Sequence, residues 1–239
     1  MTKRVPIFAH RGASGSILEN SFQSFVKAKQ IGADGIEFDI HRSSDDVLIV
    51  YHDSNLMRLT GVDKYIDECT AEELRQYKLG SRFGRLFAPK KMPLFQEVMD
   101  WANEHKMPVN IELKKSLLKN PTALILSLSN LQLPTGSHVS SFYEELLIIV
   151  KEVRPDIETA IIVTKAFNWE TISELDHIDA IHANKKYYKP LFLTSCDAAK
   201  KGIRFYGVKG NEPFIRKPHP AVIGWITDYP NRVRKQQNR

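Results

Sequence analysis

The chain has 239 residues, of which 42% are hydrophobic, and this composition excludes a disordered chain and supplies enough apolar side chains for a large core. The length is ordinary for one α/β barrel, and no stretch approaches the ~18 consecutive apolar residues that cross a membrane. The net charge of +6 is compatible with an anionic partner, but the basic residues are scattered and no nucleic-acid-binding signature accompanies them. We therefore expect a single domain over residues 1–239, with no transmembrane segment and no nucleic-acid partner.

The N-terminal stretch MTKRVPIFAHRG has a basic start but no apolar run of signal length. The two cysteines, Cys69 and Cys196, form neither a CxxC pair nor a metal-binding spacing. We expect free thiols in a reducing compartment, and therefore a cytoplasmic protein.

Strand-like apolar runs alternate with helix-like stretches in chain order. Eight runs are predicted to form parallel strands, at 5–9, 35–41, 108–113, 138–142, 159–163, 180–183, 204–208 and 221–227. Helices are predicted within 19–32 and at about 95–106, 119–131, 144–153, 168–176 and 190–201. Asn20 or Ser21 is a plausible N-cap of the first helix, and Gly32 is a plausible stop.

Repeated βα units predict a parallel sheet with right-handed crossovers, and eight strands can close into a TIM (β/α)8 barrel. The first βα turn, AHRGASGSILEN, lacks the GxGxxG spacing of a dinucleotide site, so an open doubly wound sheet is disfavoured. A further short run at 47–53 returns after the second strand, and residues 54–94 are predicted to form a small insertion at that point. The basic tail at 232–239 is predicted to be a solvated terminus.

Polar side chains gather where the predicted strands end, which is where the active sites of TIM barrels lie. These residues are His10, Arg11, Glu37, Asp39, His52, Asp53, Glu112 and Lys114. Because side chains alternate along a strand, Glu37 and Asp39 share one face while Phe38 lies on the other.

Three carboxylates in one place repel one another, and a hard divalent cation removes the conflict. Oxygen ligands suit Mg²⁺, Ca²⁺ or Mn²⁺ better than zinc, so Glu37, Asp39 and Glu112 are predicted to form a metal site. The alternative is a structural network of ion pairs with Arg11 and Lys114.

His10 and His52 lie beside this acidic cluster and are predicted to act as a general acid and a general base. Arg11 and Lys114 add positive charge that suits a phosphate group. Together these groups predict a site for a phosphodiester. The other histidines are expected to be ordinary core or surface residues: His41, His105, His138, His177, His182 and His219.

Residues 10–61 carry HRG, an ENS before a helix, GADGIEFD, then HD and RLTG, and they resemble the glycerophosphodiester phosphodiesterase family. NIELK at 110–114, SSF at 140–142 and WITDYP at 225–230 extend the resemblance over nearly the whole chain. One segment departs, because YGVKGNEPF at 206–214 stands where relatives commonly have a WTVND-like sequence.

The resemblance implies a TIM barrel with an insertion after the second strand, catalytic residues His10 and His52, phosphate-binding residues Arg11 and Lys114, and metal ligands Glu37, Asp39 and Glu112. It also implies one divalent cation, a small-molecule glycerophosphodiester substrate, and products that are sn-glycerol 3-phosphate and an alcohol. Such an enzyme would serve glycerol and phospholipid metabolism.

Two other functions stay open at this point. One is a phospholipase D-like enzyme that acts on lysophospholipids, for which Leu79, Phe83, Leu86 and Phe87 in the insertion would supply an apolar, membrane-facing surface. The other is a non-catalytic barrel that binds an anion or a metal. The sequence leaves open which histidine is the acid, and whether water or a substrate hydroxyl attacks first.

Overall fold

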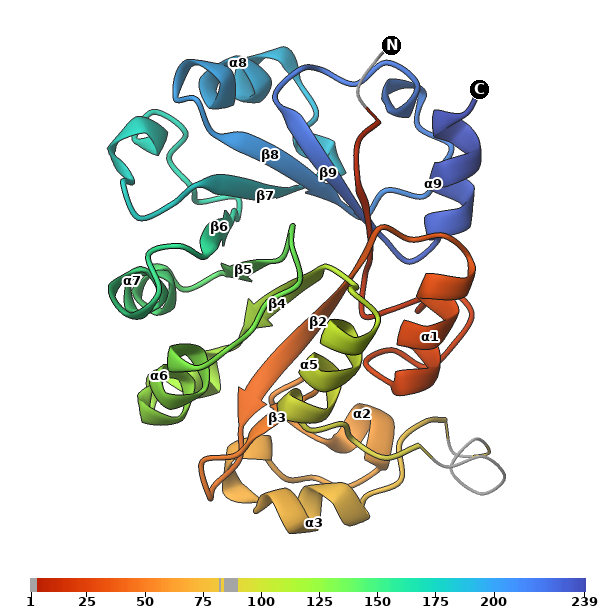
Figure 1. Ribbon diagram of the computed structural model, residues 1–239, viewed down its shortest axis with the longest axis vertical. Coiled ribbons are helices and arrows are strands. Elements are labelled where there is room, and N and C mark those ends of the chain that lie inside the picture. The colour runs from red at the N-terminus through yellow and green to blue at the C-terminus, as the bar shows by residue number, and fades with distance from the viewer. Residues whose placement is uncertain (1–3, 82, 84–89) are drawn as a thin grey trace.

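A computed structural model describes residues 4–81, 83 and 90–239 (Figure 1). Within these residues, eight parallel strands form a closed barrel, because β1 pairs with both β9 and β2. The barrel strands are β1 (Ile7–Ala9), β2 (Gly35–Arg42), β4 (Val109–Leu113), β5 (His138–Ser141), β6 (Glu158–Ile162), β7 (Ala180–Asn184), β8 (Gly202–Tyr206) and β9 (Val222–Thr227). The predicted TIM barrel is confirmed.

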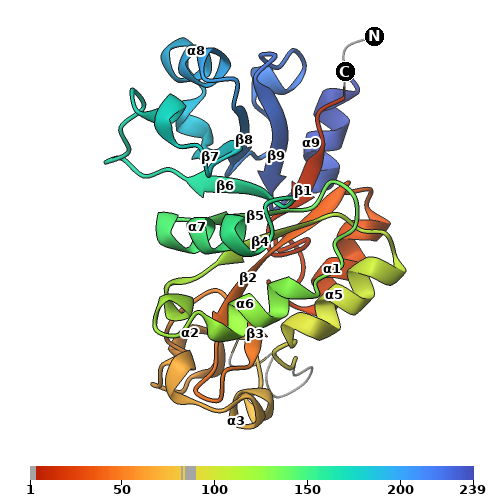
Figure 2. The same ribbon diagram turned by 60° about the vertical axis from the view of Figure 1, so that its left-hand side comes forward.

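Helices cover the outside of the barrel (Figures 1 and 2). They are α1 (Phe22–Gln30), α5 (Phe95–Glu104), α6 (Thr122–Ser129), α7 (Glu144–Val153), α8 (Pro190–Ala198) and α9 (Pro230–Gln237). Ser21 caps α1 by accepting a hydrogen bond from the backbone N–H of Ser24, as predicted. In the described part of the chain, no helix has the length and apolar character needed to cross a bilayer.

Two predicted helices are wrong in extent. The helix expected at 168–176 is only a 3-10 turn at Ile172–Glu174. Here the Asn168 carboxamide accepts from the Glu170 N–H, and the Thr171 hydroxyl donates to the Asn168 carbonyl, so local side-chain bonds compete with a helix. The helix expected at 119–131 begins only at Thr122, because Pro121 disfavours a helical conformation at the residue before it.

The insertion after β2 has a small core of its own. Strand β3 (Leu48–Val50) pairs antiparallel with β2, and α2 (Met57–Thr60), a 3-10 turn (Ile66–Glu68) and α3 (Ala71–Gln76) follow. Buried side chains of this core include Ile49, Tyr51, Leu56, Ile66, Leu74, Leu79 and Met92.

The apolar surface predicted for this insertion is corrected in part. Leu79 is buried in the small core just described, at 1% exposure, and so cannot face a membrane. Phe83 is 73% exposed, whereas Leu86 and Phe87 lie outside the described residues.

The C-terminal tail at 232–239 was predicted to be solvated, but most of it belongs to the helix α9. This helix packs beside the start of the barrel (Figure 1). Pro230 occupies its first turn, where a missing N–H costs little. Val233 is fully buried, and the Arg234 guanidinium lies 2.6 Å from the Asp34 carboxylate. The tail therefore closes the outer layer of the barrel.

Strand β2 explains how an apolar strand carries two acids. The Phe38 ring packs outward between α1 and α5, 5.9 Å from Phe25 and 6.3 Å from Phe95 between ring centroids. Because side chains alternate, Glu37 and Asp39 point into the barrel. The acidic face of β2 therefore meets the interior of the barrel, while its apolar face meets the helices.

Candidate active site

The carboxyl ends of the strands surround a cavity of about 200 Å³. Its charged side comes from the first strands and the turn after β3, and consists of His10, Arg11, Glu37, His52, Asn110 and Glu112. Its other side is largely apolar and consists of Phe142, Ile162, Tyr206 and Ile226, with His182 among them. The cavity is therefore divided into a half suited to a charged group and a half suited to an apolar or hydroxylated one.

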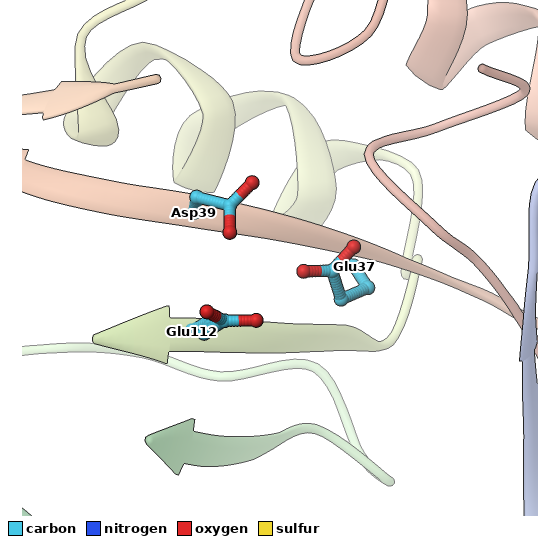
Figure 3. A group of neighbouring side chains, drawn as sticks. All are labelled: Glu37, Asp39 and Glu112. Atoms are coloured by element: carbon cyan, nitrogen blue, oxygen red, sulfur yellow. The ribbon is translucent and has the colours of Figure 1, made fainter. Parts of the chain in front are cut away.

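The three predicted metal-ligating acids do come together. Asp39 on β2 lies in register with Glu112 on β4, and Glu37 precedes Asp39 on the same face. One carboxylate oxygen from each residue lies within 4.8 Å of the others (Figure 3). All three side chains are buried. A donor set of three carboxylates at this spacing could bind a hard divalent cation.

Glu37 carries the strongest sign of a missing partner. Its Oε2 accepts a hydrogen bond of 2.7 Å from the Arg11 backbone N–H, but its Oε1 is buried without a hydrogen-bond partner among the described residues. Burial raises the pKa of Glu37 to about 8, and the nearby charge of Asp39 adds to the shift. A buried carboxylate oxygen that lacks a partner is costly, and a cation beside it would remove the cost.

Asp39, in contrast to Glu37, is held in its ionised form. Burial opposes its ionisation, but the charges of Lys114 and Arg11 hold the pKa of Asp39 well below its usual range. The Lys114 ammonium lies 2.7 Å from Asp39 Oδ1 and also contacts Glu112. Part of the alternative prediction, an ion-pair network, is thus present, yet among the described residues no ion pair of this network includes Glu37.

Arg11 adopts an unusual backbone conformation in the turn after β1. Its φ of 52° lies in the left-handed region, which a non-glycine residue rarely occupies. The turn is fixed on both sides, because the Arg11 N–H donates to Glu37 and the Ser24 hydroxyl donates to the Arg11 carbonyl at 2.9 Å. The side chain is held by Glu19 at 2.8 Å and lies 3.4 Å from Asp39, which aims the guanidinium toward the acidic cluster.

His10 forms a pair with Asp228, which follows β9. His10 Nδ1 lies 2.7 Å from Asp228 Oδ1, and the Ser14 hydroxyl donates to the same carboxylate oxygen at 2.8 Å. Burial lowers the pKa of His10, but the charge of Glu37 and the bond to Asp228 outweigh it, so the net shift is upward. With Nδ1 engaged, Nε2 is the ring nitrogen left for the cavity.

His52 forms a similar pair with its neighbour in sequence. His52 Nδ1 lies 2.6 Å from Asp53 Oδ1, and the Arg58 guanidinium donates to Asp53 Oδ2 at 2.5 Å. Arg58 also donates two hydrogen bonds to Glu19, which holds Arg11. Burial lowers the pKa of His52, and the positive charge of Lys114 adds to this, so the two histidines shift in opposite directions.

All seven predicted site residues therefore lie around one cavity or its acidic cluster. The sequence had indicated no part in orienting the site for the residues that do so: Asp228, Asp53, Glu19, Asn20 and Arg58. The Asn20 carboxamide donates to Asp39 at 2.8 Å, for example. These residues belong to the motifs ENS, HD, RLTG and WITDYP. Their place in these motifs was the feature of the sequence that could have identified them.

His182 was expected to be an ordinary residue, but it lines the cavity. Its ring meets the His138 ring edge-on at 5.2 Å between centroids, and His138 meets Phe8 in the same way at 4.9 Å. Burial, together with the charge of Arg204, lowers the pKa of both histidines well below the usual value. Two neutral imidazoles thus form the floor beneath the site.

Comparison with known proteins gives consistent matches, two of which extend over nearly the full chain. A sequence model described as "Glycerophosphoryl diester phosphodiesterase family" matches residues 10–232. A glycerophosphodiester phosphodiesterase of Caldanaerobacter subterraneus subsp. tengcongensis is 28% identical, over 96% of this chain and 98% of that protein. The human protein named lysophospholipase D GDPD1 is 36% identical over 49% of this chain and 40% of its own length.

The fold has close counterparts among solved structures. A phosphodiesterase of Oleispira antarctica, solved in complex with the product sn-glycerol-3-phosphate, superposes with a TM-score of 0.83 at 24% identity, over 98% of this chain and 97% of that one. A glycerophosphodiester phosphodiesterase of Agrobacterium tumefaciens superposes with a TM-score of 0.80 at 23% identity, over 96% and 98% of the two chains.

Proposed function

Since the chain belongs to the glycerophosphoryl diester phosphodiesterase family, we propose that it hydrolyses glycerophosphodiesters to sn-glycerol 3-phosphate and an alcohol, in a reaction that depends on a divalent cation. The observation that carries the proposal is one cavity that joins a buried acidic triad, an arginine and two oriented histidines. Anionic phosphodiesters need positive charge and proton transfer together, and these groups supply both.

Glu37, Asp39 and Glu112 would hold the cation, which we propose to be Mg²⁺, Ca²⁺ or Mn²⁺ because every donor is a carboxylate oxygen. When bound, such an ion supplies positive charge that polarises a phosphoryl oxygen. Arg11 and Lys114 extend the positive charge along the cluster and bind the remaining phosphate oxygens.

His10 and His52 are the proposed acid and base, because each has its Nδ1 bonded to an aspartate, which leaves Nε2 as the ring nitrogen for proton transfer. The opposite directions of their pKa shifts support His10 as the protonated partner and His52 as the neutral one. His52 then removes a proton from an attacking water, or first from the substrate's own glycerol hydroxyl to give a cyclic phosphate that water opens in a second step, and His10 protonates the departing alkoxide. The apolar half of the cavity receives the part of the substrate that carries no phosphate charge.

A substrate panel tests the proposal directly. The purified protein is incubated with glycerophosphocholine, glycerophosphoethanolamine and glycerophosphoglycerol in Mg²⁺, Ca²⁺, Mn²⁺ or EDTA, and glycerol 3-phosphate is measured with a coupled enzyme. We expect release that requires a cation and is lost in His10→Ala and Glu37→Gln. Equal release in EDTA would exclude the metal, and no release with any diester would exclude the activity.

A second candidate substrate class is the lysophospholipids. The apolar side of the cavity, formed by Phe142, Ile162, Tyr206 and Ile226, supports it, since a glycerophosphodiester alcohol alone needs little apolar surface. Hydrolysis of lysophosphatidylcholine and glycerophosphocholine by the same preparation separates the two classes. Faster release of choline from the lipid would favour this candidate.

A cytoplasmic location is also a proposal. Cys69 and Cys196 are both free and buried, as in proteins of reducing compartments. Fractionation of the source cells, with the protein followed by antibody, tests it.

A further inference from the structure

The segment at residues 185–192, KKYYKPLF, interleaves lysines with aromatic and aliphatic residues and contains no acid. It connects β7 to the first turn of α8, at the edge of the cavity, because the last residue of β7, Asn184, lies in register with Tyr206 of the cavity wall. The proposed reaction uses none of its side chains.

Half of the segment is fixed to the barrel. The Lys185 ammonium lies 2.5 Å from the Glu212 carboxylate, and this ion pair neutralises it. The Tyr188 ring stacks on Phe214 at 4.0 Å between centroids, and its hydroxyl accepts a hydrogen bond from the His219 N–H. These contacts hold the segment rigidly against the loop after β8.

The other half of the segment faces solvent. Lys186 and Lys189 are exposed, and Leu191 is 70% exposed. Beside them, the partly buried Trp169 ring, from the loop after β6, lies 4.6 Å from Phe192 and 5.9 Å from Tyr187. Figure 2 shows this loop standing out from the barrel.

Contact between water and the exposed Leu191 side chain costs free energy. A bilayer interface, in contrast, is a favourable environment for the apolar, aromatic and basic side chains of this surface. Aromatic rings with one polar edge favour the lipid headgroup region, and lysines beside them are attracted to anionic headgroups. A nucleic acid would satisfy the lysines but offers no apolar environment for Leu191. Phe142, which lines the cavity, is also 43% exposed.

We propose that the surface formed by Lys186, Lys189, Leu191 and the Trp169 ring docks this protein on an anionic phospholipid bilayer, with the mouth of the cavity beside the headgroups. Docking is a binding event and does not depend on the proposed hydrolysis. This surface differs from the membrane-facing surface predicted in the insertion, since its residues follow β6 and β7, whereas the insertion follows β2.

Vesicle sedimentation in EDTA and without substrate tests the proposal. The full chain is mixed with vesicles of phosphatidylcholine alone or of phosphatidylcholine with phosphatidylglycerol. We expect binding to the mixed vesicles only, weakened by salt. Lys186→Glu/Lys189→Glu should lower the partition coefficient by at least about tenfold, since each lysine near an anionic surface contributes measurably. Leu191→Ser should lower it by about fivefold through lost apolar burial.

Matched variants elsewhere on the surface control for charge and hydrophobicity. Lys29→Glu/Lys78→Glu makes the same charge change, and Leu126→Ser removes a leucine that is 67% exposed on α6. Both should bind like the wild type, and all variants should keep the wild-type unfolding temperature and hydrolysis of glycerophosphocholine. The proposal is wrong if the wild type does not sediment, if the control and segment variants lose binding equally, or if a DNA duplex is bound and vesicles are not.

Discussion

His10 Nδ1 lies 2.7 Å from Asp228 Oδ1, and this contact joins the turn after β1 to the turn after β9, where the barrel closes. The backbone repeats the connection, because the His10 N–H donates to the Thr227 carbonyl at 2.9 Å. The contacts that close the barrel at this point therefore also orient the His10 imidazole. A residue near the N-terminus is held in place by one near the C-terminus.

Replacing Asp228 with asparagine should separate orientation from charge. Asp228→Asn keeps a side chain of the same shape, but an amide no longer stabilises the protonated imidazole, so we expect kcat to fall about 10- to 100-fold with little change in KM. Steady-state kinetics on glycerophosphocholine measures both constants. Because Asp228 acts through His10, the double variant His10→Ala/Asp228→Asn should be no slower than His10→Ala. A further loss in the double variant would show that Asp228 acts independently.

Arg58 links the two halves of the charged site without contacting the cavity itself. It binds Asp53, which holds His52, and Glu19, which holds Arg11. Arg58→Lys keeps the charge but loses the forked geometry, so we expect kcat/KM to fall about tenfold. Arg42→Lys, which alters another ion pair to an exposed aspartate, is the control and should have little effect. Equal activities of the two variants would contradict this role for Arg58.

The fold and the side of the barrel on which the charged groups lie could be predicted from the sequence, because both follow from short-range periodicity. Alternation along β2 placed Glu37 and Asp39 on the interior face, and strand ends in a parallel barrel must meet. Where local side-chain hydrogen bonds competed with a helix, at Asn168 and Thr171, periodicity gave the wrong answer.

Residues that orient the site were harder to predict. Asp228 is 218 positions from His10, and Arg58 is 39 from Glu19, so their pairing depends on closure of the barrel and not on local spacing. His182 is flanked in the sequence by the apolar residues Ile181 and Ala183, and it lines the cavity because its side chain points from β7 into the barrel. These residues therefore meet the groups that they contact only in the assembled barrel.

Glu37→Gln should abolish activity and yet stabilise the metal-free protein. The folded-state pKa of about 8 is above the ordinary value of 4.5, so the folded wild type binds more protons than the unfolded chain and loses stability as pH rises through this window. The glutamine side chain does not ionise, so the variant does not lose stability in this pH range. In EDTA, we expect the variant to exceed the wild type in free energy of unfolding by about 2 kcal/mol at pH 9, and by much less near pH 5.

Urea denaturation at several pH values measures this difference, and Glu68→Gln, in the exposed insertion, is the matched control. Added Mg²⁺ should reverse the order, because only the wild type retains the complete set of carboxylates. The cation must also displace the Glu37 proton, so its apparent affinity should rise with pH up to about 8. A cation affinity independent of pH would contradict a protonated Glu37.

The paired histidines under the site should make the protein less stable in mild acid. His138 and His182 are fully buried, and their pKa values lie well below the model-peptide value of 6.5, so both stay neutral in the folded protein. The unfolded chain takes up protons at these positions below about pH 6.5, so stability is complete above that pH and falls as pH falls. Between pH 7.5 and 5.5 we expect a loss of about 1.4 kcal/mol for each histidine.

His138→Leu isolates one of the two contributions. Leucine is neutral at every pH and fills a similar space beside Phe8, so the variant should lose about half of the decrease that the pair causes, whatever its absolute stability. The free energy of unfolding in urea at pH 7.5 and 5.5, for both proteins, gives the comparison. Because His138 lies below His182 and does not line the cavity, hydrolysis at pH 7.5 should persist. The same decrease in both proteins would mean that His138 takes up its proton at the same pH in the folded and the unfolded states.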